Sequence, residues 1–96
     1  MTRDETIGLL SSRRQDLLGL GVKSLAIFGS IARNEAGPES DVDVLVEFQG
    51  AATFDGYLAL KDYLEDLLGR EVDLVTRNAL RPRLKDSVEH EAIYVS

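Results

Sequence analysis

The sequence predicts an α/β (α+β) fold in which helices pack on a small mixed β-sheet. Apolar residues make up 44% and charged residues 29% of the 96 residues, a composition typical of a globular domain. Segments whose apolar residues recur at helical spacing alternate with short apolar runs that suit buried strands. No internal repeat, low-complexity tract or long linker is present, so one domain with one core is expected over residues 1–96.

The first expected element is a helix that begins at a capping box. Thr2 and Glu5 stand three residues apart, and each side chain can satisfy a free backbone donor of the other. Gly19 and Gly21 are expected to end this helix, because glycine readily adopts the left-handed conformation beyond a helix end. The apolar stripe of the helix comprises Ile7, Leu10, Leu17 and Leu18.

Two strands are expected on either side of a short helical turn. Ser24 to Phe28 is an apolar run long enough for a buried strand, and Ser30 to Asn34 is typical of a helical turn. The next strand is the clearest, because its residues alternate between an apolar face and a face that carries an acidic residue. The first face comprises Val42, Val44, Val46 and Phe48, and the second carries Asp43 and Leu45.

The second half of the chain predicts two more helices and a third strand. A helix from about Phe54 to Leu68 is expected to end at Gly69, and Glu71 to Thr76 forms the third strand. The apolar stripe of this helix comprises Phe54, Tyr57, Leu58, Leu64, Leu67 and Leu68. Pro82 suits the first turn of a last helix that runs to about Glu91. The segment 93–95 is then either a closing strand or a docked tail.

A Gly-Ser pair and three aspartates form the candidate site. Gly29 lets a phosphate chain approach the backbone closely, and Ser30 offers a hydroxyl and neighbouring amides at the start of a helical turn. After ten intervening residues, Asp41 and Asp43 stand two apart, so their carboxylates project from the same face of a strand. Asp73 alternates with apolar residues in the third strand. Three such carboxylates can hold Mg²⁺ on nucleotide phosphates, although the sequence does not establish that the two strands are neighbours.

This pattern resembles the polymerase-beta-type nucleotidyltransferase superfamily. It is most similar to the smallest branch, the minimal nucleotidyltransferases that serve as antitoxins beside HEPN-domain toxins. The resemblance rests on Gly29-Ser30, the spacing to Asp41-Val42-Asp43, and Asp73 in a later strand, and it covers nearly the whole chain. It implies a polymerase-beta-like nucleotidyltransferase core.

The residues that flank these motifs also match the branch, with one departure. Arg33 and Ser40 fit the flanks of the Gly-Ser and Asp-x-Asp motifs. Asn34 stands where glycine often follows the arginine. Asparagine tolerates left-handed backbone angles better than most residues, so the turn is expected to form.

The resemblance implies an enzyme that transfers a nucleoside monophosphate, AMP from ATP, to a hydroxyl of a partner protein. Two Mg²⁺ ions are implied, one held by Asp41 and Asp43 and the other by these two and Asp73. Asp73 is also a candidate to accept the proton of the attacking hydroxyl. The implied nucleotide-binding residues are Gly29, Ser30, Arg33 and Ser40.

The leading partner implied by the resemblance is a HEPN-type toxin, which the enzyme would inactivate as its antitoxin. A binding-only antitoxin, which neutralises the toxin by covering it, is the alternative reading. A third reading is transfer to a small molecule such as an antibiotic. The long helix and the end of the chain carry more apolar residues than so small a core needs, namely Phe54, Tyr57, Ile93, Tyr94 and Val95. This excess favours an interface with a toxin or with another copy of the chain.

Charge and composition exclude several other classes of protein. The chain carries 17 acidic and 11 basic residues, a net charge of −6, whereas a protein that binds duplex nucleic acid needs a basic face. With no cysteine, it has neither disulfides nor thiolate metal sites. No apolar run approaches the length of a membrane span, so a cytoplasmic location is the default expectation.

For three further features, a structural role is expected rather than a role in the site. His90 is interpreted as part of a solvated helix face. Tyr57 and Tyr63 are interpreted as packing residues rather than as platforms for a nucleobase. A basic cluster is interpreted as a solvated helix start, with contact to a partner or to a triphosphate as the alternative, and it comprises Arg77, Arg81, Arg83 and Lys85.

Overall fold

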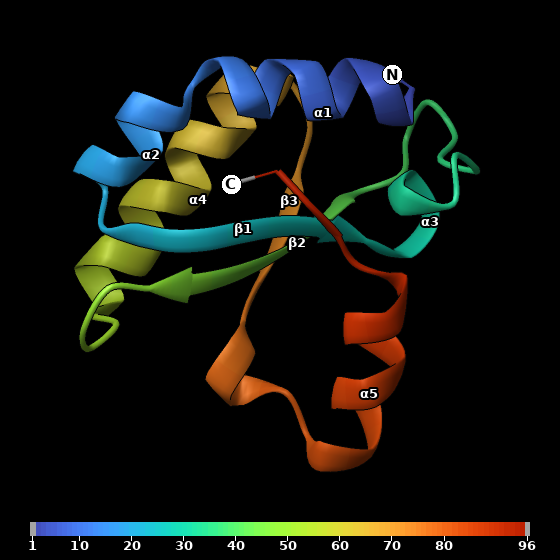
Figure 1. Ribbon diagram of the computed structural model, residues 1–96. Helices are drawn as coiled ribbons and strands as arrows, with labels where there is room; N and C mark the ends of the chain where they lie inside the picture. The colour runs from blue at the N-terminus through green and yellow to red at the C-terminus, as the bar shows by residue number, and fades with distance from the viewer. Residues whose placement is uncertain (1, 96) are drawn as a thin grey trace.

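The computed structural model describes residues 2–95, and these form a four-stranded mixed sheet with helices on both sides (Figure 1). The expected fold class is confirmed. In chain order the elements are α1 Arg3–Ser12, α2 Arg14–Gly19, β1 Val22–Phe28, α3 Gly29–Ala32, β2 Val42–Phe48, α4 Phe54–Leu68, β3 Val72–Thr76, the 3-10 helix η1 Arg77–Ala79, α5 Pro82–Glu91 and β4 Ile93–Tyr94.

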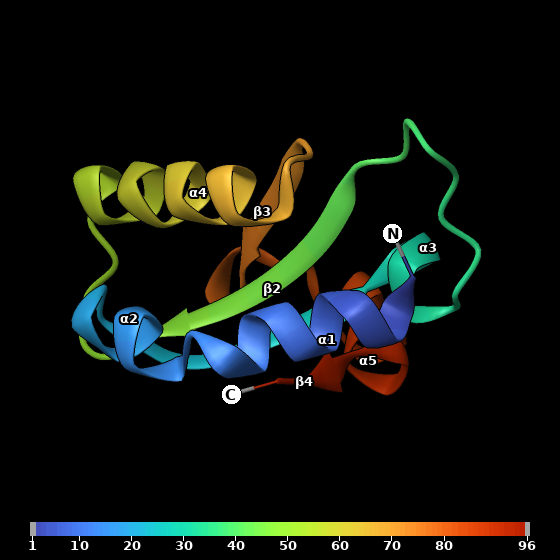
Figure 2. The ribbon, with the colours of Figure 1, turned by 90° about the horizontal axis from the view of Figure 1, so that it is seen from above.

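The sheet has the strand order β3-β2-β1-β4. Strand β1 runs antiparallel to both β2 and β4, whereas β2 and β3 are parallel and are joined by the crossover helix α4. Helices α1, α2 and α4 cover one face of the sheet, and η1 and α5 lie on the other side (Figures 1 and 2). No helix within residues 2–95 is both long and apolar enough to cross a membrane.

The core lies between the sheet and the three helices on its first face. Val44 of β2 is buried and pairs with Ile27 of β1 on one side and with Leu74 of β3 on the other. Residues directly opposite one another in neighbouring strands share a face of the sheet, so these three side chains form one apolar row. The adjacent residue of β2, Asp43, therefore lies on the opposite face, the side on which η1 and α5 lie.

The first helix is broken, which corrects the expectation of a continuous helix up to Gly19. The capping box is present, since Glu5 N donates to Thr2 Oγ1 (3.1 Å) and Thr2 N donates to Glu5 Oε1 (3.0 Å). The break falls at Arg13, directly after Ser12, whose hydroxyl donates to the Leu9 carbonyl at 2.7 Å. Serine side chains compete in this way with the backbone hydrogen bonds of a helix, which favours an end at this point.

The closing segment is a strand rather than a docked tail. Tyr94 pairs with Ala26 and Ile93 pairs with Ile27, and the N–H of Val95 donates to the Leu25 carbonyl at 2.8 Å. The 3-10 helix η1 had no signal in the apolar pattern, because its three residues are too few for a periodicity.

The start of α4 corrects a second expectation. Phe54 and Leu58 belong to the predicted apolar stripe, but their side chains are 75% and 39% exposed. Figure 2 shows that α4 begins beyond the end of β2, so its first turns have no sheet beneath them. Tyr94 is also exposed, whereas Val95 is buried. An interface at the exposed residues stays a prediction.

Candidate functional site

The sheet places two of the three aspartates side by side. Asp43 and Asp73 are direct partners in the parallel pairing of β2 with β3, so their side chains share the face opposite the main core. Asp41 comes one residue before β2, and the N–H of Val42 donates to the Glu71 carbonyl at 3.0 Å. The two strands that carry these aspartates are therefore neighbours, which the sequence could not establish. All three aspartates lie at one end of this strand pair.

Gly29 brings the backbone of the β1–α3 turn against Asp43. The glycine has φ = +68°, in the left-handed region that other residues rarely adopt. A Cβ atom at this position would overlap Asp43 Oδ2 and would lie 3.0 Å from its Cγ. The turn that carries Ser30 is therefore close to the central carboxylate, and the Ser30 hydroxyl has no hydrogen-bond partner among residues 2–95.

The three carboxylates differ in burial and in charge environment. Asp41 and Asp73 are exposed and Asp43 is half-buried. Burial, followed by the charges of Asp73, Asp41 and Glu91, raises the pKa of Asp43 above its usual range, and the charge of Arg33 opposes this. The three aspartates are thus near enough to interact through their charges. Even so, no group of three or more His, Cys, Asp or Glu side chains within residues 2–95 is gathered closely enough to form a ready-made metal site.

The donor set fits a hard divalent cation. Magnesium is bound by carboxylate oxygens together with waters and substrate phosphates, rather than by a cage made only of protein groups. Two aspartates in register, a third two residues away, and a glycine whose missing side chain makes room for the Asp43 carboxylate meet this requirement. Histidine and cysteine ligands are not needed.

Arg33 is held by carboxylates. It follows α3 and forms ion pairs with Glu35, at 3.2 Å, and with Glu91 at the end of α5. These contacts raise the pKa of the Arg33 guanidinium, Glu91 being the larger cause. Arg33 thus ties the Gly-Ser turn to α5. Glu91 was not identified from sequence, because nothing local connects it with a residue 58 positions earlier.

Ser40 shapes the turn before Asp41. Its Oγ accepts a hydrogen bond from the N–H of Gly37 (3.0 Å), and its own N–H donates to the Gly37 carbonyl (3.2 Å). Asn34 has φ = +60°, which confirms that it takes the left-handed conformation expected for this position. Its Oδ1 accepts a hydrogen bond from the N–H of Arg3 at 3.1 Å, so the side chain also anchors the loop to α1.

The two tyrosines of α4 pack within the fold, as predicted. The Tyr57 hydroxyl donates to the Leu74 carbonyl at 2.6 Å, and the Tyr63 hydroxyl donates to Asp16 Oδ2 at 2.7 Å. His90 is exposed, in agreement with a solvated helix face.

The basic cluster divides into two parts. Arg77 forms ion pairs with Glu89, at 2.8 Å, and with Glu47, at 3.6 Å. The other three residues are exposed at the start of α5, where they form the solvated helix start that was predicted, namely Arg81, Arg83 and Lys85.

Comparison with known sequences identifies relatives over most of the chain. A family model described as a nucleotidyltransferase domain matches residues 8–95. The protein MJ0128 of Methanocaldococcus jannaschii, provisionally named a protein adenylyltransferase, is 52% identical over 75 residues, which is 77% of this chain and 76% of that protein. Protein adenylyltransferase MntA of Thermococcus cleftensis is 36% identical over 96 residues, covering 99% of this chain and 97% of its own length.

Solved structures share the fold. A chain described provisionally as a minimal nucleotidyltransferase superposes with a TM-score of 0.85 and 36% identity, and the match covers 97% of this chain and 95% of that one. A chain from a complex of a tri-AMPylated Shewanella oneidensis HEPN toxin with an MNT antitoxin has a TM-score of 0.68 and 18% identity. That match covers 94% of this chain and 71% of the other, and at this identity it shows the fold alone.

Proposed function

The chain belongs to the nucleotidyltransferase domain family, as a minimal nucleotidyltransferase of the protein adenylyltransferase type, and we propose that it transfers AMP from ATP to a hydroxyl of a partner protein, with release of pyrophosphate. The observation that carries the proposal is the register of Asp43 with Asp73, beside a glycine at which a Cβ atom would overlap the Asp43 carboxylate. Such an arrangement provides carboxylate ligands for a cation beside the backbone of the Gly-Ser turn.

Each residue of the site has a separate role in this proposal. Asp41, Asp43 and Asp73 would hold Mg²⁺, which when bound neutralises the phosphates and lowers the pKa of an attacking hydroxyl. Gly29, which has no side chain, lets the triphosphate approach the backbone of the turn, and Ser30 offers a free hydroxyl to it. Asp73, which is exposed, can accept the proton of the incoming hydroxyl once it lies within hydrogen-bond reach.

Arg33 and Ser40 support the site from the sides in the same proposal. Arg33 anchors the Gly-Ser turn through Glu91 and Glu35, and Ser40 closes the turn that precedes Asp41. Positioning of this kind matters because phosphoryl transfer depends mainly on the in-line placement of the nucleophile and on charge stabilisation.

We propose a HEPN-type toxin as the partner that supplies the hydroxyl. The names of the relatives support a protein acceptor, and a chain of the same fold occurs in a complex that contains a tri-AMPylated HEPN toxin. A docked partner also presents its hydroxyl at a high effective concentration, which a freely diffusing small molecule does not. The chain would then act as an antitoxin that modifies its toxin.

A melting experiment tests the metal assignment. Mg²⁺ or Mn²⁺ together with ATP is expected to stabilise the fold by mass action, by about 2.7 kcal/mol at a ligand concentration of about 100 times Kd. The double variant Asp41→Asn/Asp43→Asn should lose this gain while remaining folded without metal. Differential scanning fluorimetry measures both, and an equal melting shift in the double variant would refute the assignment.

The transfer reaction is tested by intact-mass measurement of the partner. The purified chain, incubated with ATP, Mg²⁺ and its co-purifying HEPN-type protein, is expected to add the mass of AMP to that protein. The single variants Asp41→Asn, Asp43→Asn and Asp73→Asn should abolish the addition.

A toxicity assay beside the mass measurement separates catalysis from binding alone. If the triple aspartate variant still rescues growth and the partner keeps its mass, the chain neutralises by complex formation and the enzymatic proposal fails. The exposed Asp62→Asn on α4 serves as a control of equal charge change, and it should transfer AMP like the wild type.

A further inference from the structure

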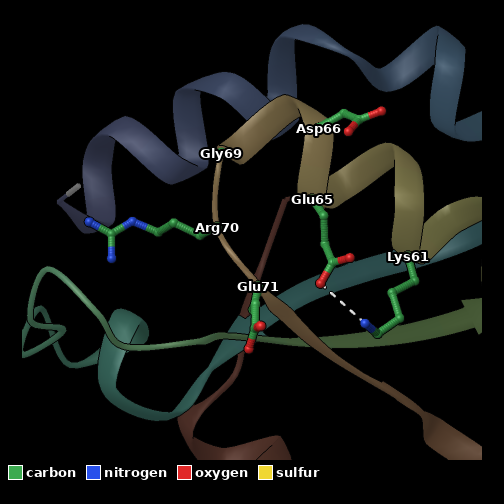
Figure 3. A pocket seen from close by; sticks show the side chains of 6 residues that line it. All are labelled: Lys61, Glu65, Asp66, Gly69, Arg70 and Glu71. Atoms are coloured by element: carbon green, nitrogen blue, oxygen red, sulfur yellow. Dashed lines mark hydrogen bonds and ion pairs between the residues drawn. The ribbon is translucent and has the colours of Figure 1, made fainter.

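Arg70 joins the end of α4 to the loop that carries Asp41. It follows Gly69, which ends α4, and only Glu71 separates it from β3. Figure 3 shows its side chain pointing away from Lys61 and Glu65, although all three line the same polar pocket of about 510 Å³. Its Nη1 donates to three carbonyl oxygens of the α3–β2 loop, those of Gly37 (3.0 Å), Pro38 (3.0 Å) and Ser40 (3.4 Å).

The side-chain partners of Arg70 are backbone carbonyls and not carboxylates. The ion pairs of Arg33 and Arg77 are made with glutamates, whereas no carboxylate within residues 2–95 forms an ion pair with Arg70. Backbone carbonyls at the open end of a turn need donors, and a guanidinium is a rigid, always charged donor. The contact therefore serves to hold the turn rather than to neutralise a charge.

Backbone contacts on both sides of Asp41 involve residues 70 and 71. On one side, the carbonyl of Ser40 accepts from Arg70, and on the other the N–H of Val42 donates to the carbonyl of Glu71 at 3.0 Å. Residues 70 and 71 thus hold the backbone on either side of Asp41. Asp73 lies two residues after Glu71. These contacts therefore fix the position of the Asp41 backbone relative to the backbone of Asp73.

We propose that Arg70 is a positioning residue for the metal site: it fixes the 37–40 turn and thereby the placement of Asp41 relative to Asp43 and Asp73. The inference rests on the proposed function, since it assumes that these aspartates bind a divalent cation. Loss of a group that orients metal ligands typically weakens metal affinity by about 10-fold to 100-fold. The same range is expected for Arg70→Ala.

The sign of the effect distinguishes positioning from simple electrostatics. Arg70 is a positive charge near a cation site, so if its charge alone mattered, Arg70→Ala would bind the cation more tightly. Positioning predicts weaker binding. The measurement is a Mn²⁺ titration by electron paramagnetic resonance, in the presence of an ATP analogue with a methylene group between the α and β phosphorus atoms, so no turnover is needed.

Two companion variants make the result decisive. Arg14→Ala removes an equal charge from an exposed position on α2 and should leave the Mn²⁺ affinity unchanged. Asp43→Asn should lose Mn²⁺ binding; if the wild type binds no better than Asp43→Asn, the proposed function fails. If the wild type binds and Arg70→Ala binds equally well or more tightly, only the role of Arg70 is overturned.

Rescue and a conservative variant cover the case in which Arg70→Ala loses stability. Free guanidinium at millimolar concentration should restore Mn²⁺ affinity to Arg70→Ala, because Arg70 also lines a second pocket, of about 160 Å³, that includes Asp41 and opens to the solvent. Should the alanine variant not fold, Arg70→Lys keeps the charge but lacks the planar fork, and it should bind Mn²⁺ several-fold more weakly at an unchanged melting temperature. Wild-type affinity in Arg70→Lys would then overturn the role.

Discussion

Gly29→Ala is expected to lower the rate of AMP transfer by about 100-fold or more, because a shift of about 1 Å in a catalytic group costs a factor of this order. The new Cβ would overlap Asp43 Oδ2, so either the carboxylate or the β1–α3 turn has to move. The residue also sits at φ = +68°, where a side chain adds strain of about 1–3 kcal/mol. A transfer assay and a melting curve measure the two effects separately.

Gly50→Ala is the matched control for this substitution. Gly50 has φ = +83°, but a Cβ there would meet no atom within 4 Å. The control therefore carries the backbone strain without the contact with Asp43, and it should lose stability while keeping its transfer rate. If the two alanine variants transfer AMP equally well, close approach of Gly29 to Asp43 has no role in the reaction.

The parts of the site that could be predicted are those encoded by short patterns. Alternation of apolar and acidic residues in two strands places Asp43 and Asp73 on the polar faces. The parallel pairing that makes them partners in register comes from the structure and was not predicted. Gly29 was recognisable as the residue without a side chain in a Gly-Ser pair that follows a strand. Each of these signals depends only on residues within a few positions of one another.

The contacts that could not be predicted join distant parts of the chain. Arg33 contacts Glu91, 58 positions later in the chain, and Arg70 contacts the 37–40 turn, about thirty positions earlier. Neither contact produces a periodic pattern in the sequence. Arg33 and Ser40 were assigned to the nucleotide by resemblance. In the structure their polar groups are used within the protein, Arg33 by two glutamates and Ser40 by the turn it closes. Tertiary contact decides between such roles, and a motif does not.

Apolar spacing predicts neither the break at Arg13 nor the exposure of Phe54. Apolar spacing predicts which face of a helix is buried, but it does not say how far the sheet beneath extends or where a side chain competes with the helix. Ser12 ends α1 through its bond to Leu9, and α4 begins beyond the end of β2. The first is a local side-chain contact and the second is a property of the assembled layers, and neither is part of the helical pattern.

Asp43→Asn is expected to abolish transfer and yet to stabilise the metal-free protein. Loss of the central carboxylate removes the ligand that lies nearest to both Gly29 and Asp73, and a loss of about 100-fold to 1000-fold in rate is expected for an electrostatic contact of this kind. Stability changes in the other direction because burial and the charges of Asp73, Asp41 and Glu91 make the ionised form of Asp43 unfavourable in the folded state. An amide at this position has no charge to place there.

The pH dependence follows from the direction of the pKa shift of Asp43. Its pKa in the folded state lies above the ordinary value of 3.8, so between these two values the folded state binds more protons than the unfolded state. Stability from this group is therefore fully present below pH 3.8 and is lost as the pH rises through the folded-state pKa. The melting temperature of Asp43→Asn should exceed that of the wild type at neutral pH, and the difference should shrink on acidification. Asp62→Asn, on the exposed face of α4, should show no such difference, and a lower melting temperature for Asp43→Asn at neutral pH would contradict the proposed charge crowding.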